Sequence, residues 1–161
     1  MFSIADICEI AIQIERNGEE TYRQASEQAE DPELAKALSW MAKEEQRHAL
    51  WFQGLRETNV PSTGNHGQLE AMGRALMRDM LENQTFSLKQ GNLSDEGNMD
   101  GLIRQSIEFE NDTILFYEML RGFLDNSEAV QHLDLIIAEE RGHVAMLENF
   151  ASVEDVKGLG H

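Results

Sequence analysis

Two copies of the pattern Glu-x-x-His occur in this chain, each at the centre of a stretch with helical apolar periodicity. The first is Glu45 and His48, within LSWMAKEEQRHALWFQGL, and the second is Glu140 and His143, within IIAEERGHVAMLENF. In both stretches the acid and the imidazole occupy positions where alternating three- and four-residue steps require apolar residues. Both pairs are therefore predicted to point into a helical core.

A carboxylate in a low-dielectric core costs several kcal/mol unless its pKa shifts or a cation binds it. Residues three positions apart lie on one face of a helix and can reach the same small volume. Metal sites in the cores of helical bundles are built from this spacing. The two pairs therefore predict a metal site.

The same chemistry recurs along the chain at a fixed spacing. Two further glutamates, Glu15 and Glu110, interrupt apolar helical stripes, and they lie 95 residues apart (110 − 15). The same offset relates three more pairs, which are Tyr22 and Tyr117, Glu45 and Glu140, and His48 and His143. The chain is therefore predicted to be an internal duplication in which each half supplies two helices to one site.

Size and composition indicate one all-α domain. The chain has 161 residues, two prolines and 7% aromatic residues, and it contains no strand-like alternating run. Short turns predict two antiparallel hairpins joined by a long crossover. The bundle is expected over 1–153, with the crossover at about 59–97 and a loose tail at 154–161. The four helices are expected at about 3–29, 32–57, 99–122 and 127–152.

These residues resemble those of the ferritin-like di-iron carboxylate proteins, and specifically of the rubrerythrin-related group. The resemblance covers nearly the whole chain and implies a ferritin-like four-helix bundle. It also implies that two carboxylates bridge two irons and that each iron has further ligands of its own. The bridging residues would be Glu45 and Glu140, and the other ligands Glu15, Glu110, His48 and His143.

The resemblance implies a di-iron oxidoreductase that reduces hydrogen peroxide or O₂, with Mn or Zn as possible substitutes for the two Fe ions. Rubrerythrins proper also carry a rubredoxin-like iron site made from two C-x-x-C pairs. Here the only cysteine is Cys8, expected to be a small core residue, so electrons are expected from an external donor such as a rubredoxin-like protein. Rubrerythrins also carry a glutamate where this chain has Ile107, which leaves six ligands.

Three other functions stay open at this point. The first alternative is a ferroxidase or an iron-binding or iron-storage protein, which would take up and release iron repeatedly. The second is a structural bundle whose buried polar groups pair without metal. The third is a hydrocarbon oxygenase, which would need an apolar substrate cavity.

Several residues near the predicted ligands have two interpretations. Tyr22 and Tyr117 lie two turns from Glu15 and Glu110, so each hydroxyl either bonds to a ligand or reaches the surface. Glu44 and Glu139 also repeat; they are alternative ligands or face outward beside the core. We expect the remaining histidines to be solvated or satisfied, and the methionine cluster to fill core gaps. These residues are His66, His132, His161, Met72, Met77 and Met80.

A formal net charge of −17 argues against nucleic acid or an anionic membrane as a partner. No apolar run is long enough for a membrane span, and the first residues lack the basic region of a secretory signal. A cytoplasmic protein is expected. The resemblance implies a homodimer, in which the long crossover would allow helices to be exchanged between subunits.

Overall fold

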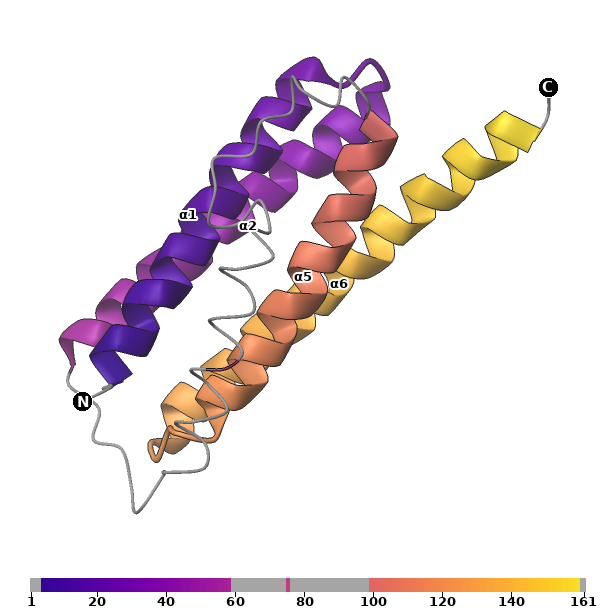
Figure 1. Cartoon of the computed structure of the whole chain (residues 1–161). Coiled ribbons are helices and arrows are strands. Elements are labelled where there is room, and N and C mark those ends of the chain that lie inside the picture. Colours follow the sequence, from indigo (N-terminus) through magenta and orange to yellow (C-terminus); the bar gives the residue numbers. More distant parts are fainter. Residues whose placement is uncertain (1–3, 59–74, 76–98, 160–161) are drawn as a thin grey trace.

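The computed structural model describes residues 4–58, 75 and 99–159, with side chains as far as 151, and these residues contain four long helices. The helices are α1 (Ile4–Gln28), α2 (Pro32–Glu57), α5 (Met99–Arg121) and α6 (Ser127–Leu159), shown in Figure 1. The predicted all-α four-helix bundle is confirmed.

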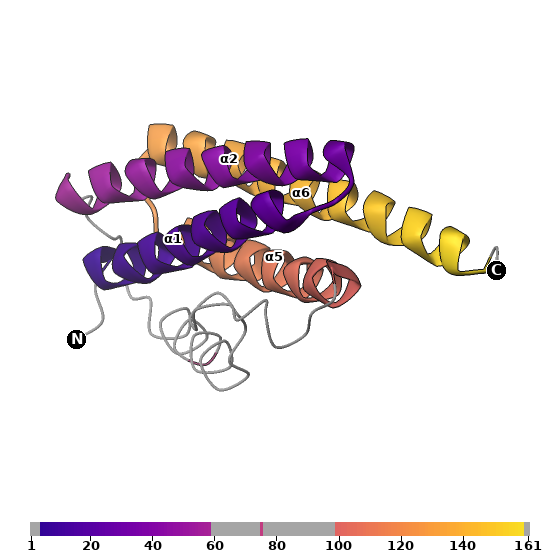
Figure 2. The same cartoon turned by 90° about the horizontal axis from the view of Figure 1, so that it is seen from above.

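The helices form two antiparallel hairpins, α1 with α2 and α5 with α6, and α6 diverges from α5 toward its C-terminal end (Figure 1). Between the hairpins, α2 lies beside α6 and α1 lies beside α5, as the second view shows (Figure 2). Helices α2 and α5 run in the same direction, so a long return connection is required between them. The predicted crossover that makes this connection lies outside the described residues, apart from residue 75.

Local sequence signals explain where two of the helices begin. The Asp31 carboxylate accepts a hydrogen bond from the backbone N–H of Glu33 at 3.0 Å, and Pro32 occupies the first helical position of α2. At the start of α6, the Asn126 side chain accepts hydrogen bonds from the N–H groups of Glu128 and Ala129. These caps satisfy backbone donors that would otherwise lack partners in the first turn.

Among the described residues, the core consists of two apolar clusters, one toward each end of the bundle. One cluster contains Ile7, Phe52 and Leu133, and the other contains Leu38 and Ile103, among other residues. The buried glutamates and histidines lie at the middle of the helices, between these clusters. The apolar residues therefore build the bundle while leaving one polar layer at its centre.

The C-terminal end of α6 differs from the prediction. We expected a loose tail from residue 154, but α6 continues to Leu159 and extends past the other helices (Figures 1 and 2). The segment after Ser152 contains no proline and has its first glycine at Gly158, so no strong stop signal ends the helix earlier. Within the described ranges, no helix combines the length and apolar character needed to cross a membrane.

Candidate metal centre

All six predicted ligand residues lie in the central polar layer, with no exposed surface. Each of the four helices contributes a glutamate, and α2 and α6 also contribute a histidine one turn later. The residues are Glu15, Glu45, His48, Glu110, Glu140 and His143. One chain is therefore sufficient to bring together every residue of the predicted site, although their role as metal ligands stays a prediction.

The six side chains form two overlapping groups of four. The first group is Glu15, His48, Glu45 and Glu140, and the second is Glu110, His143 and the same Glu45 and Glu140. Within each group, one potential ligand atom per residue lies within 4.8 Å of the others. Glu45 and Glu140 belong to both groups. Two ions bridged by carboxylates would need two such shared residues.

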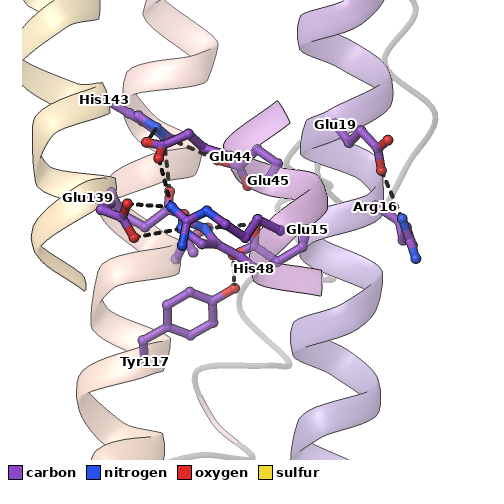
Figure 3. Close-up of polar contacts among 12 residues, drawn as sticks. Glu15, Arg16, Glu19, Glu44, Glu45, His48, Tyr117, Glu139 and His143 are labelled. Atoms are coloured by element: carbon purple, nitrogen blue, oxygen red, sulfur yellow. Dashed lines mark hydrogen bonds and ion pairs between the residues drawn. The ribbon is translucent and has the colours of Figure 1, made fainter. Parts of the chain in front are cut away.

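The histidines face the centre through their Nδ1 atoms. His48 Nδ1 lies 2.8 Å from Glu140 Oε1 and 3.5 Å from Glu15 Oε2. His143 Nδ1 lies 3.2 Å from Glu45 Oε1 and 3.7 Å from a Glu110 oxygen. Figure 3 shows Glu15, Glu45 and both histidines converging from their helices.

Many of these atoms have no hydrogen-bond partner, although buried polar atoms normally have one. The unsatisfied atoms in the layer, judged among the described residues, belong to all six side chains: Glu15 Oε2, both oxygens of Glu45, His48 Nδ1, Glu110 Oε2, both oxygens of Glu140 and His143 Nδ1. His48 Nδ1 and Glu140 Oε1 thus lie close together without the angles that a hydrogen bond requires. Carboxylate oxygens and imidazole nitrogens left unsatisfied around one volume fit divalent cations.

The electrostatics of the metal-free layer indicate the same need for cations. Burial, followed by the charge of Glu140, raises the pKa of Glu110 to about 8, and burial with neighbouring carboxylates raises the pKa of Glu45 well above its usual range. Burial opposes a charged imidazole, but Glu15 and Glu140 raise the pKa of His48 to about 11. Without metal, the layer therefore holds protons that bound cations would displace.

The two tyrosines hydrogen-bond to glutamates of the layer, and each bond crosses between the repeated halves. The Tyr22 hydroxyl donates to Glu110 Oε1 at 2.6 Å. The Tyr117 hydroxyl donates to Glu15 Oε1 at 2.5 Å, and Figure 3 shows this second bond. Both tyrosines are fully buried. Of the two interpretations, bonding to a candidate ligand is therefore the one observed.

Glu44 and Glu139 make contacts that sequence reasoning missed. Neither residue belongs to the two groups of four. Neither simply faces outward, because each carboxylate contacts the Nε2 atom of a histidine in the opposite hairpin. The repeat at 95 residues was the available signal, but it gave no indication that the contacts would cross between halves.

Other predicted residues lie away from the layer. His132 is partly exposed and stacks on Trp51, with ring centroids 4.6 Å apart, which agrees with a satisfied histidine. Cys8 is fully buried in the apolar core, as predicted, and burial raises the pKa of its thiol to about 12. His66, His161 and the methionine cluster lie outside the described residues.

A family model described as Rubrerythrin matches residues 6–151, which is most of the chain and includes all four glutamates and both histidines. The chain belongs to the rubrerythrin family. No curated protein matches this rubrerythrin-family chain significantly.

A similar fold occurs in a crystal structure from Thermotoga maritima of a protein assigned to the ferritin-like diiron-carboxylate proteins. The two chains superpose with a TM-score of 0.67 at 20% sequence identity, over 93% of this chain and 95% of the other. At this identity the likeness shows the fold, and it confirms the ferritin-like architecture of this member of the rubrerythrin family.

Proposed function

We propose that this protein binds two iron ions in the central layer and reduces hydrogen peroxide with electrons from a separate donor protein. The observation that carries the proposal is the pair of overlapping four-residue groups that share Glu45 and Glu140. Four ionised carboxylates balance two divalent ions, so the loaded layer would be neutral in a core that disfavours net charge.

Two bound Fe²⁺ ions would supply the two electrons that convert hydrogen peroxide and two protons into two water molecules. The residues of the chain have distinct tasks. Glu15 with His48, and Glu110 with His143, would each complete one ion, while Glu45 and Glu140 would hold both. Tyr22 and Tyr117 each hold one carboxylate oxygen, Glu110 Oε1 and Glu15 Oε1, while Glu110 Oε2 and Glu15 Oε2 have no hydrogen-bond partner and would be free to bind metal.

An external donor fits the sequence, because Cys8 is the only cysteine and is buried. We include a rubredoxin-like donor, a cytoplasmic location and a homodimer in the proposal. An exchange of helices between subunits is not needed to assemble the layer, since one chain contains all six residues.

The alternative function is iron oxidation for uptake or storage. One observation favours it: Ile107 occupies the position where rubrerythrins carry a further glutamate, and it packs with the apolar cluster around Leu38 and Ile103. Among the described residues, the layer therefore has six candidate ligands and no seventh carboxylate. A net charge of −17 would also concentrate Fe²⁺ near the protein.

Rapid mixing distinguishes the two functions. Protein loaded anaerobically with Fe²⁺ is mixed with hydrogen peroxide or with O₂, and oxidation is followed by near-ultraviolet absorption of ferric iron. The peroxidase proposal predicts faster oxidation by peroxide, repeated turnover with a reductant, and iron that stays bound. Faster oxidation by O₂, followed by release of ferric iron, would establish iron handling instead.

A further inference from the structure

Behind the two histidines lies a second polar group that the proposed function does not use. His48 Nε2 is 3.1 Å from Glu139 Oε1, and His143 Nε2 is 3.1 Å from Glu44 Oε1. In both cases the histidine and the glutamate belong to different hairpins (Figure 3). The two contacts are thus related by the internal duplication, with each half supporting the histidine of the other.

A single arginine joins the two carboxylates. Arg47 Nη2 donates to Glu44 Oε2 at 2.7 Å and also to Glu139 Oε2. The position 95 residues later is Gly142, where an added Cβ would meet nothing within 4 Å. The duplication is therefore broken at this point, and among the described residues one guanidinium contacts the carboxylates behind both histidines.

We propose that Glu139, Glu44 and Arg47 are positioning residues for the two histidines in a crossed arrangement. Glu139 orients His48, Glu44 orients His143, and Arg47 holds both carboxylates in place. This inference rests on the proposed metal binding, and it assigns a separate glutamate to each metal and a shared arginine to both.

The physical reason is the two-sided chemistry of imidazole. A histidine that binds metal through Nδ1 carries its proton on Nε2, and a carboxylate that accepts this proton fixes both the tautomer and the ring orientation. Loss of such a partner typically lowers metal affinity about 10- to 100-fold. Because the two contacts are separate, loss of one glutamate should affect one metal.

Proton NMR of protein loaded with two Co²⁺ ions tests the arrangement. Each Nδ1-bound histidine should give one exchangeable, paramagnetically shifted Nε2–H signal. The His143 signal is identified by its proximity to the Trp40 ring, whose centroid lies 5.6 Å from that of the imidazole. Glu139→Leu should remove the His48 signal by rapid exchange and weaken one of two Co²⁺ affinities about 10-fold or more.

The other variants make the test specific. Glu44→Leu should instead remove the His143 signal, whereas Glu139→Gln and Glu44→Gln should keep both signals, because the amide oxygen still accepts the proton. Arg47→Met should accelerate exchange of both signals. The matched control is Arg141→Met, which should change neither signal. Arg141 is also exposed and pairs with a glutamate of another helix, Glu118, at 2.6 Å, but it contacts neither histidine.

Two failures are distinguishable. Wild-type protein that binds no Co²⁺ would overturn the metal proposal and this inference with it. Wild-type protein that binds two Co²⁺ ions, with both Nε2–H signals unchanged in Glu139→Leu and Glu44→Leu, would overturn the positioning role alone. Loss of both signals in each single variant would also overturn it, because the crossed, one-to-one assignment would be wrong.

Discussion

Gly18 shows how closely single residues fit the central layer. A Cβ at this position would lie 3.1 Å from Glu45 Oε2 and 3.3 Å from Phe109 Cε1, inside normal contact distances. Glycine in the middle of a helix costs about 1 kcal/mol relative to alanine, so the absence of a side chain here leaves room for the Glu45 carboxylate at a cost to α1.

Replacement of Gly18 by alanine should therefore weaken metal binding by displacing Glu45, with little gain in stability. Gly54→Ala is the matched control, because Gly54 is exposed on α2 and its added Cβ meets nothing within 4 Å. The control should stabilise the protein by up to about 1 kcal/mol and leave metal affinity unchanged. Calorimetric Co²⁺ titration and urea unfolding measure both effects; equal metal affinities in the two variants would contradict the steric explanation.

The crossed tyrosines make a second prediction at this scale. Tyr117→Phe leaves a buried oxygen of Glu15 without its donor, and Tyr22→Phe does the same to Glu110. Each variant should lower the free energy of unfolding of the metal-free protein by about 1–3 kcal/mol in urea denaturation. If only one variant is destabilised, the equivalence of the two tyrosines is wrong.

Residue by residue, the sequence predicted which side chains would gather but not all of their contacts. The four glutamates and two histidines were predictable because each polar residue replaced an apolar one in a helical stripe. The partners of Glu44 and Glu139 were not predictable, because helical periodicity places a residue on a face of its own helix and leaves the opposing residue in the other hairpin undetermined.

At the level of helices, α2 depends on a cap that was visible in the sequence. Asp31→Ala removes the acceptor for the Glu33 N–H and should lower the free energy of unfolding by about 1 kcal/mol, seen as a lower thermal midpoint. Asp31→Asn keeps an acceptor oxygen and should stay close to wild type. Equal losses in both variants would indicate that the charge, rather than the hydrogen bond, stabilises this end of α2.

Helix ends were predicted where strong local signals exist and missed where they do not. The Asp31-Pro32 pair marks the start of α2, and the structure begins that helix at Pro32. The predicted end of α6, near Ser152, lies about two turns before the observed end at Leu159.

For the whole molecule, proton uptake by the central layer sets how metal-free stability depends on pH. Folding raises the pKa of Glu110 from 4.5 to about 8 and that of His48 from 6.5 to about 11. A group whose pKa is raised on folding stabilises the folded protein at low pH, and this stabilisation is lost as the pH rises toward the folded pKa. Metal-free protein should therefore become less stable between pH 5 and pH 9.

Bound metal should reverse that dependence, because the ligands must then be deprotonated and protons compete with the ions. Urea unfolding at several pH values measures how the free energy of unfolding changes with pH, once without Co²⁺ and once with it. Each titrating group contributes at most about 1.4 kcal/mol per pH unit to this change. In metal-free protein, Glu110→Gln should make the free energy of unfolding fall less steeply with pH below pH 8. Parallel slopes with and without metal would show that the layer does not exchange protons for ions.

The duplication predicted the architecture of the whole molecule, since two antiparallel hairpins that each contribute half of one site must face each other across it. What the sequence could not supply was the choice of partners across the hairpins. That choice depends on the exact rotation of each helix about its axis.

The central claim is that two metal ions share Glu45 and Glu140, and anaerobic titration of metal-free protein with Fe²⁺ tests it most directly. The account predicts tight binding of two Fe²⁺ ions per chain in the wild type and loss of both in the Glu45→Ala, Glu140→Ala double variant, with the helical circular dichroism signal retained. No stoichiometric binding in the wild type, or two ions still bound by the double variant, would contradict the claim.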